Sequence, residues 1–255
     1  MLRALFSRAE LPAVVKEIGR TGAQRAIWIV IDVLRATTTI LSAFEAECAA
    51  IFPTVSIAEA RRLRSKARRG NRLLAGERNG QPIRGFDLGN SPREFLPGRV
   101  AGREIVLTTV NGTRTMKAAA EAGAREIWLA SFGNAGAVAR RGALRFREGG
   151  RGGQVNIVCS GKQALFCLED AVCAGLIVQE ICGNAGGRIG LTDSALACWN
   201  LYERHRKHLL GMLQESCWGR HLQSLGLGAD LEYCARTGWS RIVPVFAGGV
   251  IRAGK

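Results

Sequence analysis

The chain has 255 residues, 47% of them hydrophobic, which excludes a disordered protein and is enough for one large α/β domain or two smaller lobes. Its 36 lysines and arginines outnumber 21 acidic residues, for a formal charge of +15. This balance favours anionic partners and does not choose among nucleic acid, acidic lipid and a polyanionic substrate.

In chain order, short apolar segments rich in β-branched residues alternate with helical patterns, as in buried parallel strands joined by helices. We predict strands at residues 27–31, 49–52, 105–107, 127–129, 155–158 and 242–246. We predict helices at residues 38–47, 57–67, 113–122, 135–146 and 166–181, and a long loop rich in glycine and proline at 76–97. The order predicts an α/β fold: a layered, mixed or mostly parallel sheet with helices on both faces. Residues 1–255 form a single unit, either undivided or in two lobes with a helical subregion at 192–225.

Two basic clusters are predicted to be solvated helix faces and loop ends. They comprise Arg61, Arg62, Arg64, Lys66, Arg68, Arg69 and Arg72, then Arg140, Arg141, Arg145, Arg147 and Arg151. No aromatic residue is interleaved among them, so a single-strand binding surface is not indicated and nucleic acid is an unfavoured partner. We also interpret His205, His208 and His221 as surface or packing residues.

The cysteines and the start of the chain indicate the cytoplasm. Eight cysteines are scattered without a C-x-x-C pair, which predicts buried thiols in a reducing compartment and no zinc site or disulfide framework. The opening MLRALFSRAE is too short and too charged for a signal peptide, and no apolar run approaches membrane-spanning length, so no membrane partner is expected.

Polar residues collect where predicted strands pass into helices, the place where open α/β sheets bind ligands. The first junction, WIVIDVLRATTTI, runs from a strand into Asp32, then Arg35, then Thr37 and Thr38. A carboxylate there can hold a metal or a proton, and a guanidinium can bind phosphate through two hydrogen bonds. The alternative is a capped helix with a structural Asp–Arg pair.

Three further junctions carry hydroxyl, amide and basic groups. EIVLTTVNGTRTM contributes Thr109, Asn111, Gly112, Thr113 and Arg114, and the helix that follows argues against a simple Asn-Gly hairpin. LASFGNAGAVA contributes Ser131 and Asn134, and VNIVCSGKQALFCLED contributes Cys159, Ser160, Gly161 and Lys162. We predict that these groups form one anion-binding site.

Spacing excludes several chemistries. Leu165 stands where a cysteine phosphatase would need arginine after Cys159, and Leu34 stands where an aspartyl-phosphate phosphatase would need a second acid. No P-loop sequence occurs. Carboxylates remain in well-placed contexts at Asp32, Glu77, Asp87, Glu169 and Asp170. This donor set suits Mg²⁺, which takes oxygen ligands and often only one or two carboxylates, better than it suits zinc.

Seven segments resemble, in the same order, those of the 2-phosphosulfolactate phosphatase (ComB-like) family. They are IDVLRATTTI, AGERNG, GFDLGNSP, LTTVNGTR, SFGNAGAVA, LEDAVCAG and IVPVFAGGVI, and the resemblance spans residues 31–251. It implies the family's distinctive α/β fold and a Mg²⁺-dependent hydrolase that removes phosphate from 2-phosphosulfolactate, a step toward coenzyme M. The substrate would be a small phosphorylated anion, either 2-phosphosulfolactate or a related phosphorylated hydroxy acid.

Roles for particular residues follow from the matching segments. The resemblance implies Asp32, Arg35 and Asn111 as catalytic residues, and Arg78 and Arg114 beside Arg35 as anion clamps. Mg²⁺ would lie between substrate phosphate and Asp32 with one of Glu77, Glu169 or Asp170. Asn90 and Ser91, in GFDLGNSP, join the junction residues as substrate-binding groups. Two segments depart from the family pattern, at Val110 and at Lys162, Gln163 and Ala164.

A rival function is a non-catalytic basic protein that binds an anion or nucleic acid. The acids beside the basic groups favour the enzyme, because an anion sensor has little use for carboxylates next to phosphate.

For the enzyme, two routes of phosphoryl transfer remain as alternatives: direct attack by water, and a covalent intermediate on Asp32. A homo-oligomer is compatible with Trp199, Trp218 and Trp239, although core and rim packing is the simpler interpretation.

Overall fold

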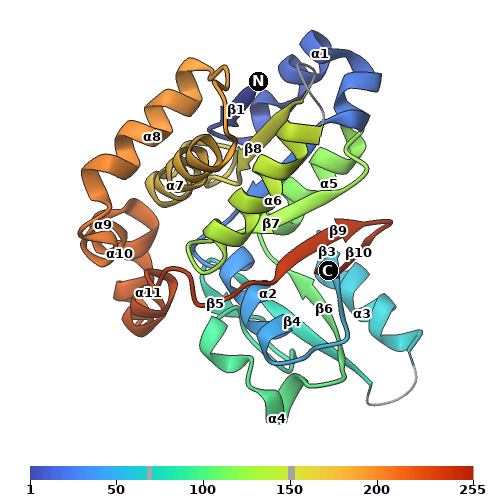
Figure 1. The fold of residues 1–255 in the computed structure, drawn as a ribbon. Helices are drawn as coiled ribbons and strands as arrows, with labels where there is room; N and C mark the ends of the chain where they lie inside the picture. Colours follow the sequence, from blue (N-terminus) through green and yellow to red (C-terminus); the bar gives the residue numbers. More distant parts are fainter. Residues whose placement is uncertain (68–70, 149–152, 255) are drawn as a thin grey trace.

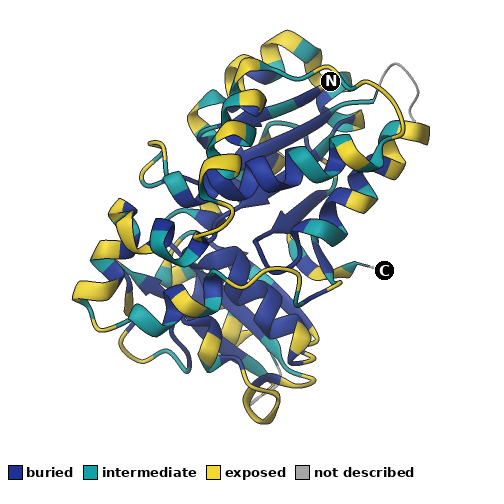
Figure 2. Ribbon diagram, turned by 60° about the vertical axis from the view of Figure 1, so that its left-hand side comes forward, coloured by how far each residue is buried: buried dark blue, intermediate teal, exposed yellow. Residues whose placement is uncertain are grey.

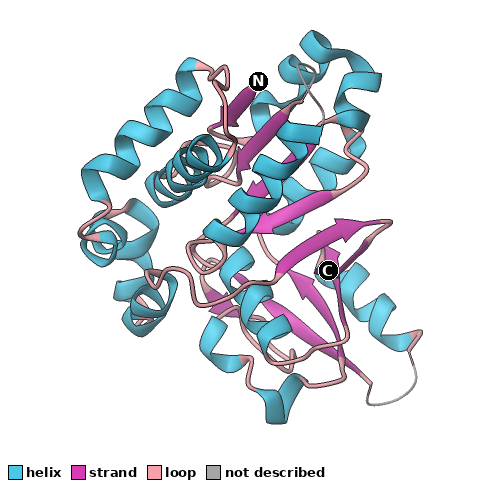
Figure 3. Cartoon of the chain, in the orientation of Figure 1, coloured by secondary structure: helices cyan, strands magenta, loops and turns pink. Residues whose placement is uncertain are grey.

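The computed structural model describes residues 1–67, 71–148 and 153–254, and shows one α/β fold with helices on both faces of a mixed sheet (Figures 1 and 3). The strands are β1 (Leu2–Leu5), β2 (Ile27–Ile31), β3 (Ala50–Thr54), β4 (Arg72–Arg78), β5 (Gln81–Pro82), β6 (Glu104–Thr108), β7 (Ile127–Ala130), β8 (Val155–Cys159), β9 (Val243–Ala247) and β10 (Val250–Gly254). The predicted fold class is confirmed.

Helices occupy most of the connections between strands. They are η1 (Arg8–Glu10), α1 (Leu11–Arg25), α2 (Ala36–Glu45), α3 (Ile57–Ser65), η2 (Pro92–Glu94), α4 (Pro97–Val100), α5 (Gly112–Glu121), α6 (Ala135–Glu148), α7 (Leu168–Asn184), α8 (Asp193–His205), α9 (Leu209–Glu215), α10 (Cys217–Ser224) and α11 (Gly228–Cys234). The predicted helical subregion is therefore three separate helices, α8 to α10, broken at residues such as Ser216, whose hydroxyl caps α10.

The sheet order is β1-β8-β2-β7-β9-β10-β3-β6-β4-β5. Two groups of parallel strands, β1-β8-β2-β7 and β3-β6-β4, are joined through the C-terminal hairpin β9–β10. The pairings β7–β9, β9–β10 and β10–β3 are all antiparallel, so the two groups run in opposite directions.

Strand β2 shows why the sheet is covered on both faces. Ile29 and Ile31 belong to a core cluster with α6, α7 and α8, whereas Trp28 and Val30 belong to the cluster with α1, α2 and α5. Alternate side chains of a strand point to opposite faces, and an all-apolar strand is buried on both. The burial colouring of Figure 2 shows this continuous buried layer beneath exposed helix faces.

Several predicted details change in the structure. The predicted loop 76–97 begins inside β4, and β1, β4, β5 and β10 were not predicted. The opening segment forms β1, which pairs in parallel with β8. Arg72, predicted to be solvated, instead forms an ion pair with Glu104 inside the sheet, with 2.8 Å between Nε and Oε2. Arg68, Arg69 and Arg151 lie outside the described residues.

Other surface predictions are consistent with the structure. The α3 residues Arg61, Arg62 and Arg64 are exposed. His208 is exposed, and His205 and His221 are half-buried. All eight cysteines are free, and most are buried. Among the described helices, none is both long and apolar enough to span a membrane.

Candidate functional site

A pocket forms where four strands end and α10 covers them. It is lined by Asp32, Leu34, Arg35, Glu77, Asn79, Asn90, Thr109, Val110, Asn111, Lys162, Gln163 and Trp218. Asp32 follows β2, Glu77 lies near the end of β4, Asn111 follows β6, and Lys162 follows β8. The pocket thus unites the ends of strands from both parallel groups.

Asp32 is held in place by the first turn of α2. Its Oδ1 accepts a hydrogen bond from the Ala36 N–H at 3.1 Å, and its backbone oxygen accepts one from the Thr37 hydroxyl at 2.8 Å. The Gly112 N–H also hydrogen-bonds to the carboxylate. An added Cβ on Gly112 would lie 2.8 Å from Asp32 Oδ2, so only glycine allows this close approach.

Burial raises the pKa of Asp32 to about 7. The N–H groups of Ala36 and Gly112 oppose this shift, whereas the charges of Glu77 and Glu169 increase it. Removing a carboxylate from water penalises its charged form, and a second negative charge nearby has the same effect. Asp32 is therefore only partly ionised near neutral pH, and a nearby cation would favour its charged form.

Glu169 and Asp170 begin α7 and lie buried near Asp32. Asp170 Oδ1 accepts from the Val33 N–H at 2.9 Å, and Oδ2 accepts from the Gly161 N–H at 3.1 Å. Burial raises the pKa of Asp170 well above its ordinary value, and the charges of Asp32 and Glu169 add to that effect. Burial likewise raises the pKa of Glu169. These acids are not among the pocket-lining residues.

Glu77 is the second carboxylate on the pocket wall. Its Oε2 accepts from the Gly80 N–H and its Oε1 from the Val110 N–H, both at 2.9 Å. Glu77 therefore ties the turn after β4 to the loop after β6. Each carboxylate oxygen can accept more than one bond, so both still have lone pairs for a ligand.

Arg35 is buried in a paired arrangement, with 3% of the residue exposed. Its Nη1 contacts Asp230 Oδ2 of α11 at 2.7 Å, and its Nη2 donates to the Gly80 carbonyl at 2.6 Å. Ser91 donates to the other oxygen of Asp230 at 2.6 Å. Asp230 thus balances the charge of Arg35, and the structural Asp–Arg pair weighed from sequence exists with Asp230 as the acid in place of Asp32.

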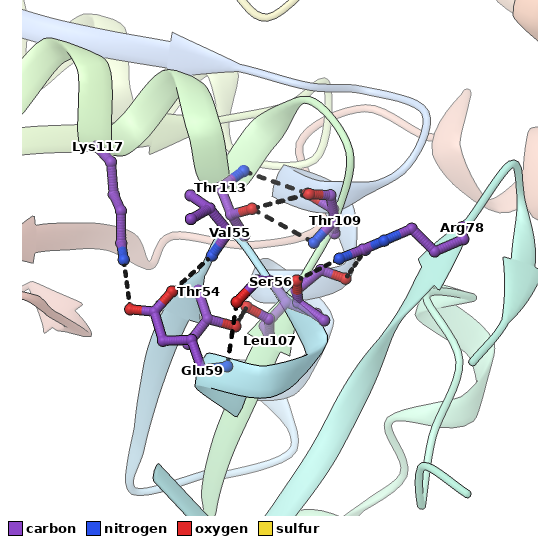
Figure 4. Close-up of polar contacts among 10 residues, drawn as sticks. Thr54, Val55, Ser56, Glu59, Arg78, Leu107, Thr109, Thr113 and Lys117 are labelled. Atoms are coloured by element: carbon purple, nitrogen blue, oxygen red, sulfur yellow. Dashed lines mark hydrogen bonds and ion pairs between the residues drawn. The ribbon is translucent and has the colours of Figure 1, made fainter. Parts of the chain in front are cut away.

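The β6–α5 junction is held by hydroxyl groups (Figure 4). The Thr113 N–H donates to Thr109 Oγ1 at 3.2 Å, and the Thr113 hydroxyl donates to the Thr109 carbonyl at 3.0 Å. Arg78 donates to Thr108 Oγ1 at 3.1 Å and to the Glu77 carbonyl at 2.6 Å. Arg78 therefore bridges β4 and β6 and is not among the residues lining the pocket.

The loop after β8 crosses the pocket. The Gln163 N–H donates to Asn111 Oδ1 at 3.0 Å. The Lys162 ammonium lies 4.8 Å from the centre of the Trp218 ring, and Trp218 lies against His221 with 4.6 Å between ring centres. The loop thus connects the start of α5 to α10 and closes one side of the pocket.

Other predicted residues lie around this pocket without lining it. Thr38 donates to the Val33 carbonyl at 2.9 Å, and Asn134 donates to the carbonyls of Leu129 and Ile242 at 3.0 and 2.9 Å. Arg114 is exposed on α5. Ser131 and Ser160 follow β7 and β8, which flank β2, and within the described chain their buried hydroxyls have no hydrogen-bond partner.

Six of the predicted site residues line the pocket: Asp32, Arg35, Glu77, Asn90, Thr109 and Asn111. Sequence reasoning missed Asp230 and Trp218 as parts of the site. Lys162, predicted as one of the groups of the anion-binding site, does line the pocket. A late helix carries Asp230 and another carries Trp218, and no motif near either marks it as reaching the pocket.

The donor set fits Mg²⁺, although no preformed cluster of three or more His, Cys, Asp or Glu side chains occurs among the residues that the structure describes. Asp32 and Glu77 are acidic pocket residues, and the buried Oδ1 of Asn90 has no hydrogen-bond partner there. Mg²⁺ commonly takes one or two carboxylates and completes its coordination with water and substrate phosphate. The carboxylates of Asp32 and Glu77 and the amide oxygen of Asn90 are therefore oxygen donors that could bind such an ion.

Comparison with known proteins finds the same family along most of the chain. Residues 13–249 match the family model described as 2-phosphosulpholactate phosphatase. A protein of Symbiobacterium thermophilum named "Probable 2-phosphosulfolactate phosphatase" is 39% identical over 223 residues, covering 88% of this chain and 92% of that protein. Proteins with the same name from Synechococcus sp. (strain JA-3-3Ab) and Thermotoga petrophila are 37% and 36% identical. They cover 85% and 87% of this chain and 86% and 89% of their own lengths.

Proposed function

This chain belongs to the 2-phosphosulpholactate phosphatase family, and we propose that it hydrolyses 2-phosphosulfolactate, or a related phosphorylated hydroxy acid, with Mg²⁺ as cofactor. The observation that carries the proposal is Asp32, a buried carboxylate on the pocket wall whose pKa burial raises to about 7. Such a strongly perturbed acid in a pocket is typical of a catalytic centre.

We assign the Mg²⁺ site to Asp32 and Glu77, because both line the pocket and the charge of Glu77 helps to raise the pKa of Asp32. When bound, Mg²⁺ would neutralise charge on the phosphate oxygens as the P–O bond breaks. Glu169 and Asp170 are buried near Asp32 but do not line the pocket. Asp170 positions the backbone after β2 and after β8, because its two carboxylate oxygens accept hydrogen bonds from the N–H groups of Val33 and Gly161.

The remaining pocket residues orient the substrate. Thr109 and Asn111 supply hydroxyl and amide groups, and Asn90 supplies a buried oxygen without a partner among the described residues. Arg35 and Asp230 hold the β4–β5 turn and α11 together, so Arg35 serves in positioning. Phosphoryl transfer depends mainly on positioning and electrostatics, and the hydrogen bonds that hold Asp32, Glu77 and Arg35 supply the positioning.

Two routes for the chemical step are compatible with this geometry. Water can attack phosphorus directly, releasing the hydroxy acid and phosphate. Alternatively, Asp32 attacks phosphorus first and water then hydrolyses the acyl phosphate. Acid quenching after one turnover with substrate labelled in the phosphate separates the routes, since only the second leaves label on the protein. A third route, with Cys159 as the nucleophile, is disfavoured, because burial raises the pKa of its thiol well above the ordinary value and so disfavours the reactive thiolate.

The decisive experiment measures phosphate release from 2-phosphosulfolactate, with Mg²⁺ and with chelator. Asp32→Asn is the test variant, and Asp193→Asn, which removes an exposed carboxylate at the start of α8, is its control. We expect metal-dependent release in the wild-type and control proteins and loss of at least about 100-fold in Asp32→Asn. Folded wild-type protein that releases no phosphate from this substrate or from related phosphorylated hydroxy acids would refute the proposal.

We also propose a cytoplasmic location. The support is eight free cysteines, five of them buried, which a reducing compartment would keep as thiols. Fractionation of cells that express the full-length protein at its natural level tests this, and recovery outside the cytoplasm would contradict it.

A further inference from the structure

Two cationic side chains line the pocket, Arg35 and Lys162. Arg35 is already neutralised, because Asp230 lies 2.7 Å from its Nη1 and the Gly80 carbonyl lies 2.6 Å from its Nη2. Among the described residues, the Lys162 ammonium lies over the Trp218 ring and its charge acts on the buried Glu169, but it forms no ion pair at contact distance. Of the two, Lys162 is therefore the cation available to a ligand.

The backbone that carries Lys162 is fixed. Its N–H donates to the Leu165 carbonyl at 3.1 Å, and the Leu165 N–H donates back at 2.9 Å. On either side, the Gly161 N–H donates to Asp170 and the Gln163 N–H donates to Asn111, at 3.1 and 3.0 Å. An added Cβ on Gly161 would lie 2.1 Å from the Leu165 carbonyl oxygen, so this tight turn requires glycine.

The side chain of Lys162 is oriented by an aromatic face. Its ammonium lies 4.8 Å from the Trp218 ring centre, and Trp218 rests on His221. His221 Nε2 lies 3.1 Å from the Asn79 carbonyl, which anchors the stack to the β4–β5 turn. A cation over an aromatic ring keeps its N–H groups, so the ammonium can still donate to an anion.

The proposed substrate carries three anionic groups: the phosphate that reacts, a carboxylate and a sulfonate. A cation held by Asp32 and Glu77 would meet the phosphate, which leaves the charges of the other groups unmatched. Lys162 lies on a different wall, in the loop that packs on α10. An ammonium is a compact point charge that binds a sulfonate oxygen without the planar geometry a guanidinium favours.

We propose that Lys162, oriented by Trp218, binds the sulfonate of the substrate and thereby gives the enzyme its preference for sulfonated over non-sulfonated phosphorylated hydroxy acids. This inference rests on the proposed phosphatase function. Lys162 determines specificity, and Trp218 positions it.

The kinetic test compares 2-phosphosulfolactate with 2-phospholactate, which lacks the sulfonate, for the wild-type protein and Lys162→Met. We expect kcat/KM for the sulfonated substrate relative to the other to fall by about 10- to 100-fold, the worth of one charge-assisted hydrogen bond. The loss should appear mainly in KM, because the sulfonate does not react. Lys162→Arg should recover part of the ratio. Lys16→Met, which removes an exposed lysine of α1, controls for the lost charge.

Trp218 provides an independent variant. Trp218→Phe keeps an aromatic face and should retain most of the preference, whereas Trp218→Leu should lose it in the same direction as Lys162→Met. An unchanged ratio in Lys162→Met, or equal losses for both substrates together with a fall in kcat, would overturn the inference. The second result would place Lys162 on the phosphate.

Binding separates failure of this inference from failure of the proposed function. Calorimetric titration with sulfolactate and with lactate needs no turnover. If wild-type protein binds sulfolactate more tightly than lactate and Lys162→Met loses this difference, the sulfonate site stands even where no phosphate is released. If the two proteins bind sulfolactate equally, the site is refuted whatever the catalytic result.

Discussion

Replacing Asp32 by asparagine should make the metal-free protein more stable at and above neutral pH. Burial raises the pKa of Asp32 from 3.8 to about 7. Between these values the folded protein binds more protons than the unfolded chain, so stability falls as pH rises. The stabilising effect of the neutral carboxyl is fully present below about pH 4 and is lost once pH passes about 7.

The magnitude follows from the difference between the two pKa values. Each pKa unit corresponds to about 1.4 kcal/mol, so ionising Asp32 costs the folded state on the order of 4 kcal/mol by pH 8. Asparagine at this position cannot ionise and avoids that cost. It also removes one of the charges that raise the pKa of Asp170, so the variant should gain stability from its neighbour as well.

The assay is urea unfolding of both proteins in chelator at pH values from 5 to 8. The stability of Asp32→Asn relative to wild type should rise across this range by just under about 3 kcal/mol, because about 2 of the roughly 3 pKa units lie between pH 5 and the folded pKa. Added Mg²⁺ should restore wild type more than the variant. Asp193→Asn, exposed at the start of α8, should follow wild type throughout. A stability difference that stays constant from pH 5 to pH 8 would show that Asp32 does not ionise at a cost, and would refute the reasoning.

Three further outcomes are expected. Arg35→Met should destabilise the protein by about 3–5 kcal/mol in urea unfolding, because Asp230 stays buried without its cation, and adding Asp230→Asn should recover part of that loss. Gly112→Ala should reduce phosphate release and lower the free energy of unfolding by about 1–3 kcal/mol, because the added Cβ would lie 2.7 Å from the Ala36 Cβ. As a control, the Cβ added in Gly211→Ala meets nothing within 4 Å, so this variant should be neutral or stabilising. Ellman's reagent should label one thiol rapidly in the native protein, and Cys217→Ser, which removes the exposed cysteine, should abolish that labelling; fast labelling of several thiols would contradict the buried arrangement.

Local patterns were sufficient to predict β2, whose range of residues 27–31 the structure reproduces, and to predict a helix starting at residue 57, where α3 begins. Strand β4 was missed because Arg72, at its start, was grouped with a solvated basic cluster, and Arg78, at its end, was assigned to the substrate. In the structure Arg72 pairs with Glu104 on the neighbouring strand, and Arg78 donates to Thr108. A charged residue inside a sheet is tolerated when a partner on the next strand balances it, and that partner is distant in sequence.

The residues of the candidate site that follow strands were predictable from the sequence, whereas those on the helices α10 and α11 were not. Asp32 and Asn111 follow apolar segments, so the local pattern marks both. Trp218 and Asp230 lie on short helices that reach the pocket only because α10 and α11 fold back over it. Arg35 was assigned to the substrate because its partner, 195 residues away, has no local signal.

From the sequence alone, alternating apolar and helical segments determine the α/β class, and the junction motifs determine the acids and hydroxyl groups that face a ligand, since both depend on neighbours a few residues apart. The tertiary structure decides which strand ends meet. The antiparallel hairpin β9–β10 reverses one parallel group relative to the other, and the residues that follow β2 and β6, Asp32 and Asn111, nevertheless line one pocket. The tertiary structure also decides that Asp230 neutralises Arg35 while the charge of Lys162 stays available to a ligand. Which charges balance one another depends on their distances in the folded protein, and these cannot be read from the number of residues between them.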